Sequence, residues 1–465
     1  MSGATARTSG TRGWTGLALA CVVLGWLGPL PGLSPDEQRA LGVTLFALIL
    51  WTAQPVPIEV SSFAVLLLLA SSGLLTFTDT FAPFAGPTIW LVFSGMVLSL
   101  ILSETGLGNR LADSALPWLA GGSRLRLLAG LHLLGMSAAF LVPAGVVRVL
   151  LLMPVGIALC RALDPDRQDV ALPPAVTLSI VCGTYYGGGA VLTGSVPNLV
   201  VAGQLESVTG YVVFWGEWLV WMFPVGGVGR MVLSIAVIWV LWGRRLLPLS
   251  QGVAPPPAAL DPEQRTMLAL LLFGVALWAT DVVHGLAPVF VGLGLVLATI
   301  LPRWGPLSVE GLRQINFPFL FYIAALFGIG EILDGAGINT RIVQAMTTAL
   351  PDAGGHWFGE HLTLTVATLP LDFLMDSAAV GAVATPSLLA EGADAGLSAL
   401  ASAMSVAMAT TVAFLPYQAA PFMAVLGFGT IRARDLSLAM LLISTLSVLL
   451  LCPLNILYWR ALGLI

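Results

Sequence analysis

Long runs of apolar residues, separated by short polar segments, recur along almost the whole chain. Each run approaches the roughly 20 residues that a helix needs to cross the hydrocarbon core of a bilayer. The pattern predicts an all-α polytopic membrane protein with about eleven membrane-spanning helices. The expected spans lie near residues 14–31, 38–53, 57–76, 86–105, 172–191, 224–242, 265–283, 286–301, 316–338, 397–415 and 433–457.

Two further apolar segments, residues 124–160 and 358–390, carry a polar or Pro/Gly break near the middle. Such a break leaves backbone groups unpaired, which is tolerated where the segment lines a cavity inside the protein. We therefore expect these two segments to form re-entrant hairpins. Residues 172–208 and 397–429 are expected to form broken helices, one after each hairpin.

An internal repeat organises these segments. ETGLGNRL at 104–111 aligns with GAGINTRI at 335–342, PAGVVRVLLLMP at 143–154 with MDSAAVGAVATP at 375–386, and TGSVPNLVVAG at 193–203 with YQAAPFMAVLG at 417–427. Each copy would cross the membrane an odd number of times, about five, so the second copy would be inverted. The expected division is a tail with an extra first helix (1–37), a first repeat (38–242), a polar, proline-rich cytoplasmic linker (243–265) and a second repeat (266–465).

Composition excludes a water-soluble domain, because 57% of residues are hydrophobic, 9% are charged and the mean hydropathy is +0.95. All 19 cationic side chains are arginines. Most of them fall on the cytoplasmic side if the N-terminus is cytoplasmic, which predicts a multi-pass protein of the inner membrane in that orientation. The scattered cysteines and histidines form no ligand pattern, so neither a metal site nor a cofactor is expected. No nucleic-acid partner is expected either.

The stretch GTYYGGGAVLTGSVPN, residues 183–198, has the composition of a ligand site in a broken helix. Glycine permits close approach of the backbone, proline removes an amide donor, and hydroxyl and amide side chains supply oxygens. The alternative is that the glycines only let helices pack, and for residues 187–189 both interpretations stay open. The candidate substrate ligands are Thr193, Gly194, Ser195, Pro197 and Asn198, with Thr411, Gln418 and Pro421 in the second broken helix.

The GNR and NTR span ends, the apolar hairpin before a proline, and above all GSVPN (194–198) make the chain similar to the divalent-anion/sodium symporter (DASS) family of the ion transporter superfamily. The resemblance covers nearly the full length. It implies transport of dicarboxylates, citrate or sulfate by a homodimer with an elevator motion. In that family each hairpin tip carries Ser-Asn-Thr, which binds substrate carboxylates and helps to bind sodium. Citrate exchangers extend the first tip to Pro-Ser-Asn-Thr-Ala-Arg.

This chain departs from the family at both tips. Pro143 and Arg148 match the longer motif, but the polar triplet is replaced by alanine, Gly145 and valine. At the second tip the triplet reads Asp376, Ser377, alanine. Gly145 and Ser377 thus take motif positions and are candidate substrate ligands by resemblance. Na⁺ and H⁺ are the two candidate coupling ions. Because the first tip has lost the oxygens that would bind sodium, we expect transport without sodium, driven by protons or a counter-anion.

Arg148 lies in the middle of the apolar run FLVPAGVVRVLLLMPVG. An arginine near the bilayer centre costs roughly 2.5–3.5 kcal/mol on insertion scales, so it needs a partner. One possibility is an intramembrane ion pair with Asp376 or Asp372; the other is that the planar guanidinium binds the substrate anion. The two aspartates are four residues apart in an apolar stretch, which suggests a coupling-ion or proton site.

The sequence therefore predicts a secondary active transporter of small anions, such as di- and tricarboxylates or sulfate-like oxyanions, and not an enzyme. One alternative is a cation/proton antiporter or a metalloid-anion exporter of the same superfamily, which would use the aspartates as its principal site. Another is a membrane-embedded enzyme, against which stands the lack of a nucleophile–base pair or a soluble catalytic domain. The expected partners are the small anionic substrate, the lipid bilayer and a second copy of the chain.

Overall fold

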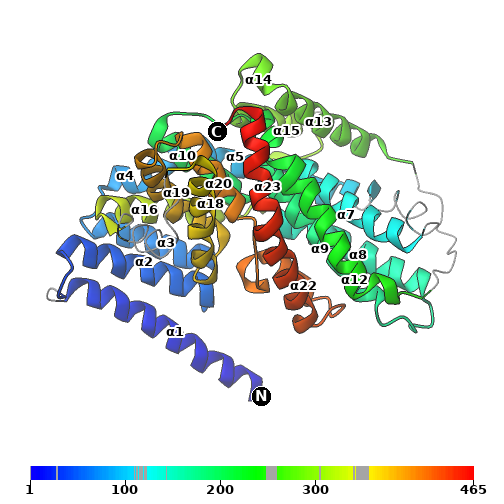
Figure 1. Ribbon diagram of the computed structural model, residues 1–465, viewed down its shortest axis with the longest axis horizontal. Helices are drawn as coiled ribbons and strands as arrows, with labels where there is room; N and C mark the ends of the chain where they lie inside the picture. Colours follow the sequence, from blue (N-terminus) through cyan, green and yellow to red (C-terminus); the bar gives the residue numbers. More distant parts are fainter. Residues whose placement is uncertain are drawn as a thin grey trace.

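The computed structural model describes residues 2–27, 30–108, 110–111, 114, 119, 123–142, 144–247, 259–302, 305–338, 341 and 355–465. Every regular element in these ranges is helical (Figure 1). The expected all-α class is confirmed for this part of the chain. Residues 248–258 of the linker and Pro143 of the first tip lie outside the described residues.

The N-terminal part forms helices that begin at clear sequence signals. The helices are α1 (Ser2–Trp26), α2 (Pro35–Ala53), α3 (Ile58–Ser71), α4 (Phe77–Phe81) and α5 (Pro87–Glu104). Helix α2 begins with a capping box, in which Ser34 Oγ accepts from the Glu37 amide and the Glu37 carboxylate accepts from the Ser34 amide. Helix α1 packs along α2 at glycines, since a Cβ on Gly42 would lie 2.9 Å from the Cys21 carbonyl oxygen.

Three helices follow that surround the first candidate site: α7 (Arg124–Leu141), α8 (Gly145–Leu163) and α9 (Leu172–Ala190). Helices α7 and α9 touch backbone to backbone. A Cβ on Gly183 would lie 2.4 Å from the His132 carbonyl oxygen, and one on Gly135 would lie 2.7 Å from the Thr184 nitrogen. Small residues are what such close helix contacts in membranes require.

The middle of the chain runs through α10 (Val196–Thr209), α11 (Trp215–Met222), a π-helical segment (Phe223–Gly229) and α12 (Arg230–Leu241). After the linker come α13 (Pro262–Ala279), α14 (Asp281–His284), α15 (Pro288–Ile300), the 3₁₀ segment η5 (Val309–Gln314) and α16 (Phe319–Gly335). Asp281 ties two of these elements together, because its carboxylate accepts from the amides of Trp215 (2.6 Å) and Gly216 (3.1 Å) at the start of α11.

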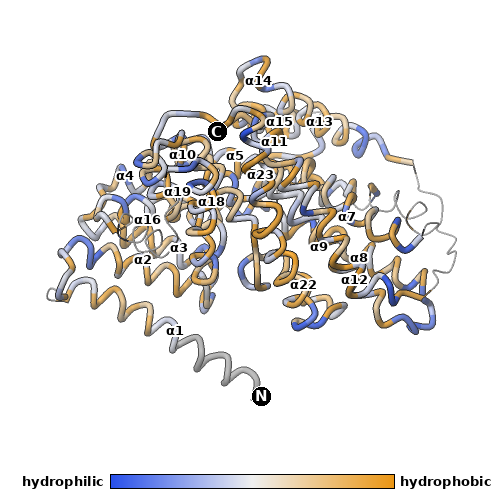
Figure 2. Tube along the Cα trace, in the orientation of Figure 1, coloured by the Kyte–Doolittle hydropathy of each residue, from blue (hydrophilic) through white to orange (hydrophobic). Residues whose placement is uncertain are grey.

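The last part repeats the order of a helix pair, a broken helix and a helix with a π-helical turn. It contains α18 (Trp357–Thr368), α19 (Ser377–Asp394), α20 (Ala399–Ala409), α21 (Ala420–Leu426), α22 (Ala433–Leu446), a π-helical turn (Ser447–Leu451) and α23 (Cys452–Leu462). The two parts of the chain interlock: α8 packs on α21, and α10 packs on α19. Hydrophobic colour runs along most of these helices, with hydrophilic residues concentrated in connections and at helix ends (Figure 2).

The expected number of eleven spans is not confirmed. Among the described residues, four helices are long and apolar enough to cross a membrane: Arg124–Leu141, Gly145–Leu163, Trp215–Leu241 and Ala433–Leu462. The bent pair Phe77–Ala85 and Pro87–Leu102, with an angle of 50°, would make a fifth. Other apolar helices are shorter; Ile58–Ser71, with 14 residues, is only about 21 Å long at 1.5 Å per residue. The two arms of the expected first hairpin are each among the four long helices.

Candidate functional site

Side-chain hydrogen bonds stabilise the break in the first broken helix. Helix α9 ends at Ala190, residues 191 and 195 are extended, and α10 begins with Pro197 in its first turn. The Asn198 amide donates to the carbonyl oxygens of Gly188 (2.9 Å) and Val191 (2.8 Å) at the end of α9, which also accept from the amides of Val191 and Gly194. Thr193 Oγ1 accepts from the Trp215 indole at 3.1 Å.

The backbone on the two sides of this break is packed so tightly that only glycine fits. A Cβ on Gly194 would lie 2.7 Å from the Gly188 carbonyl oxygen, and one on Gly188 would lie 2.3 Å from Arg148 Nη2. A Cβ on Gly189 would lie 2.4 Å from Thr411 Cγ2. Among residues 187–189, Gly187 packs on Met136 of α7, whereas Gly188 adjoins Arg148 and Gly189 adjoins Thr411.

Arg148, on the first turn of α8, is fully buried and is held by backbone carbonyls. Its Nη1 donates to the carbonyl oxygens of Val142 (2.5 Å) and Gly194 (2.9 Å), and its Nη2 donates to that of Thr184 (3.0 Å). Because a guanidinium has five N–H donors, two remain, and Nε has no partner within the described part of the chain. The hypothetical ion pair with Asp372 or Asp376 is not formed.

The two aspartates of the second tip have different surroundings. Asp376 is the N-cap of α19, where it accepts from the amides of Ala378 (2.9 Å) and Ala379 (3.3 Å), and it also accepts from the Tyr322 hydroxyl of α16 at 2.6 Å. Asp372 is 1% exposed, and neither of its carboxylate oxygens has a partner among the described residues. Of the two expected coupling residues, Asp372 is therefore the one whose carboxylate oxygens lack a hydrogen-bond partner in the described ranges.

The second broken helix repeats features of the first. Helix α20 ends at Ala409, a 3₁₀ turn spans Pro416–Gln418, and α21 begins with Pro421 in its first turn. Gln418 closes the break by donating to the Asp372 carbonyl oxygen at 2.8 Å. Pro421 meets the first tip, since a Cβ on Gly145 would lie 2.8 Å from Pro421 Cγ.

Arg230 is a second buried arginine, and it was not among the residues predicted to form the site. It lies at the start of α12, is 2% exposed and donates to Thr411 Oγ1 and to the Met408 carbonyl oxygen (3.0 Å). Each arginine thus contacts one broken helix near the end of its first half, where unpaired carbonyls and the helix dipole favour a cation. In the sequence Arg230 falls within the expected span 224–242, and no motif around it marks it as part of the site.

These groups are arranged around α9. Neighbouring residues of a helix are rotated by about 100°, so Thr184 and Gly188 share one face and Tyr186 and Gly189 another. The first face meets Arg148 and the second meets Thr411 and Arg230, whose guanidinium lies 6.0 Å from the Tyr186 ring. Tyr185 falls between the two faces.

Tyr185 adjoins the second tip. Its hydroxyl lies near the Asp372 carboxylate and the Ser377 hydroxyl, and its ring lies 4.8 Å from the Phe422 ring. The Tyr185 and Ser377 hydroxyls are buried and, like the Asp372 carboxylate, have no partner in the described ranges. The structure therefore brings together Gly145, Arg148, Gly194, Asn198, Asp372, Ser377, Thr411, Gln418 and Pro421, whereas Asp376 faces Tyr322 and Ser195 makes no cap hydrogen bond.

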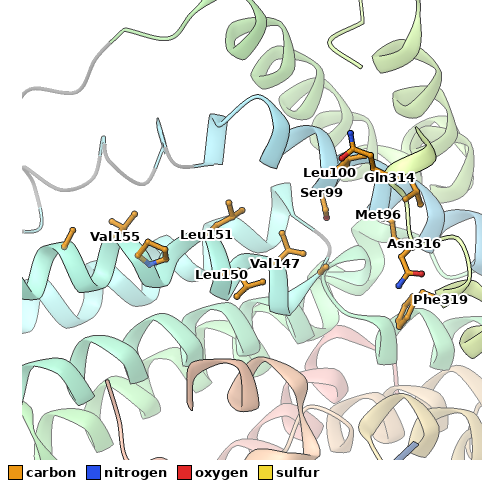
Figure 3. Close-up of a pocket in the computed structure, with 14 residues that line it drawn as sticks. Met96, Ser99, Leu100, Val147, Leu150, Leu151, Val155, Gln314, Asn316 and Phe319 are labelled. Carbon is orange, nitrogen blue, oxygen red and sulfur yellow. The ribbon is translucent and has the colours of Figure 1, made fainter. Parts of the chain in front are cut away.

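A cavity of about 870 Å³ opens beside these residues, between α8, α5 and the segment from η5 to α16 (Figure 3). Its lining is mainly apolar, with Ser99, Gln314 and Asn316 as the polar side chains. None of the candidate ligands lines it, although Ala144 and Val147 of the first tip do. Several of the candidate ligands are packed against one another instead, as Gly145 is against Pro421 and Arg148.

The sequence profile of the citrate transporter family, CitMHS, matches residues 46–413. The chain is 22% identical to the citrate/succinate antiporter of Escherichia coli K12, over 89% of this chain and 91% of that protein. It is also 22% identical to the sodium-dependent dicarboxylate transporter SdcS of Staphylococcus saprophyticus, over 72% of this chain and 68% of that protein. Among solved structures, the YdaH transporter of Alcanivorax borkumensis has a similar fold, with a TM-score of 0.54, 15% identity and coverage of 83% of this chain and 88% of that one.

Proposed function

Because the chain belongs to the citrate transporter family, in agreement with the DASS resemblance of its motifs, we propose that it is a secondary active transporter of small di- and tricarboxylates. Transporters of such anions are among its relatives, and the relatives cited above are transporters rather than enzymes. The apolar helices agree with a multi-pass membrane protein. Sulfate-like oxyanions are the second substrate class that the site chemistry accommodates, because they too present oxygens to a guanidinium.

The buried Arg148 carries this proposal. Its charge is surrounded by carbonyl oxygens, and no carboxylate of the described residues lies within ion-pair distance. Three donors fix the guanidinium in place, and the remaining two can bind a substrate carboxylate without moving the side chain. A fixed arginine with unused donors, at the junction of the first tip and the first broken helix, suits an anion better than a structural ion pair.

The proposed architecture is an inverted repeat. Residues 38–242 and 266–465 form its two copies, with the hairpins at 124–160 and 358–390 and the broken helices at 172–208 and 397–429. The helices before each hairpin would form a scaffold, and the hairpins and broken helices a transport domain that moves as an elevator. A homodimer in the inner membrane with a cytoplasmic N-terminus completes the proposal. The repeated order of broken helices and the packing of α8 on α21 and α10 on α19 support it.

For coupling, we propose protons or a counter-anion rather than sodium. The oxygens that the first tip would offer to sodium are replaced by Ala144, Gly145 and Val146. Asp372 is buried beside the candidate site without a hydrogen-bond partner for its carboxylate. Protonation would remove its negative charge when the substrate anion enters, and deprotonation would help to release the anion. One relative carries the name of a sodium-dependent transporter and another that of an antiporter, so the driving force needs a direct test.

The test is uptake of labelled succinate, citrate and sulfate into proteoliposomes under a sodium gradient, a pH gradient, or internal counter-substrate alone. We expect uptake of succinate or citrate with a pH gradient or counter-substrate and without sodium. Strict dependence on external sodium would overturn the coupling proposal but not the transport proposal. Cation movement without any organic anion would instead favour a cation/proton antiporter.

A further inference from the structure

We propose that Arg230 is the second cationic group of the substrate site, so that the site takes anions with two separate acidic groups. This inference rests on the proposed transport function and names the feature of the substrate that the site recognises. Arg230 is buried without a carboxylate partner. Burial of a charge inside a membrane protein costs free energy, and residues of this kind mark functional sites.

The bonds that Arg230 makes leave part of it unused. Nη1 donates to Thr411 Oγ1 and Nη2 to the Met408 carbonyl oxygen, and Nε has no partner among the described residues. Two donors fix the guanidinium at the second break, as three fix Arg148 at the first. The Cys452 thiol also contacts the guanidinium, so at most two of its five donors, Nε among them, are available for a ligand.

The two arginines lie on different faces of the same short stretch of α9. Arg148 is bonded to the carbonyl of Thr184 and adjoins Gly188, whereas Arg230 faces the Tyr186 ring and binds the Thr411 side chain that adjoins Gly189. A ligand with two acidic groups could place one on each guanidinium. Gly188 packs against Arg148 and Gly189 packs against Thr411, so no side chain of α9 separates the two arginines at these positions.

The groups between the two arginines suit such a ligand. The hydroxyls of Tyr185 and Ser377 are buried and without partners in the described ranges, and each can donate to an anionic oxygen. The Asp372 carboxylate lies near them, also unpartnered. These three groups lie close to one another and none makes a well-aligned hydrogen bond in the described ranges, whereas buried polar atoms are otherwise paired. Asp372 would have to be protonated, as in the coupling proposal, when a dianion binds beside it.

The test compares two four-carbon acids that differ by one carboxylate, succinate and butyrate, in proteoliposomes containing the full chain. For Arg230→Gln we expect the KM for succinate to rise about tenfold or more, the usual effect of losing a charge-assisted hydrogen bond. Competition by butyrate against labelled succinate should change little in this variant, so its preference for the diacid should fall. Arg230→Lys keeps the charge and should fall between wild type and Arg230→Gln. Arg161→Gln, at an exposed arginine of α8, is the matched control and should behave as wild type.

Three other outcomes would overturn the inference. Equal weakening of succinate and butyrate in Arg230→Gln and Thr411→Val, with a lower melting temperature in both, would mean that Arg230 only supports the second broken helix. An unchanged preference for succinate in a folded Arg230→Gln protein would exclude Arg230 from the site while leaving the transport proposal intact. Wild-type protein that moves neither succinate nor citrate would refute the transport function, and this inference with it.

Discussion

The substitution Gly188→Ala tests whether α9 tolerates a side chain at position 188, beside Arg148. The new Cβ would lie 2.3 Å from Arg148 Nη2 and 2.9 Å from the Gly194 carbonyl oxygen, whereas ordinary contact begins near 3.4 Å. The guanidinium would have to move by roughly 1 Å, a displacement that stretches its bonds to Thr184 and Gly194 beyond normal length. Overpacking of this kind costs about 1–3 kcal/mol.

Two assays report the effect of Gly188→Ala. Thermal unfolding of the purified protein should show lower stability, and uptake of succinate into proteoliposomes should show a KM raised about tenfold, because the donors that face the substrate are displaced with the guanidinium. Gly294→Ala is the matched control: Gly294 also lies within a helix, but a Cβ there meets nothing within 4 Å. That control should be neutral or slightly stabilising. Normal stability and normal uptake in Gly188→Ala would refute the proposed close contact between α9 and Arg148.

Three further substitutions test separate parts of the account. Asp372→Asn should abolish the response of uptake to an imposed pH gradient while leaving counter-substrate exchange intact, and a pH response equal to that of wild type would remove Asp372 from the coupling proposal. Asp376→Ala should lower stability by about 1 kcal/mol through loss of the α19 N-cap, with the pH response kept; thermal unfolding and pH-driven uptake measure the two effects, and loss of the pH response would return the coupling role to Asp376. Asp281→Ala should lower stability by about 1–3 kcal/mol, because the amides of Trp215 and Gly216 lose their buried acceptor; thermal unfolding equal to that of wild type would contradict that role.

Sequence reasoning reached the family and the helical class because both depend on local signals. Long apolar runs identify membrane helices whatever they pack against, and GSVPN is a short motif with a specific backbone purpose. Arg148 was also recognisable, since a permanent charge in an apolar run needs a compensating environment. The number of spans was less accessible, because several apolar runs form helices shorter than a bilayer, such as Ile58–Ser71 with 14 residues, and hydropathy alone does not show where a helix ends.

The partners of the charged groups could not be predicted because they arise from contacts distant in sequence. Arg148 is bonded to carbonyls of Thr184 and Gly194, which carry no side-chain signal. Arg230 contacts Thr411 and the Met408 carbonyl, which lie about 180 residues further along the chain, so its place in the site has no local signal. For Asp376 a signal existed: an aspartate directly before a helix-forming run of small residues is a common N-cap pattern. That pattern would have favoured Asp372 as the coupling residue.

Arg148 is the residue proposed to bind the anion that the protein transports. The most direct measurement is uptake of labelled succinate and citrate into proteoliposomes by wild type, Arg148→Ala and Arg148→Lys, each shown to be folded by size-exclusion chromatography and thermal unfolding. The account predicts uptake by wild type, none by Arg148→Ala, and weak uptake by Arg148→Lys, because an ammonium cannot keep three carbonyl contacts and still offer a planar pair of donors. Wild-type uptake by a folded Arg148→Ala protein would contradict it.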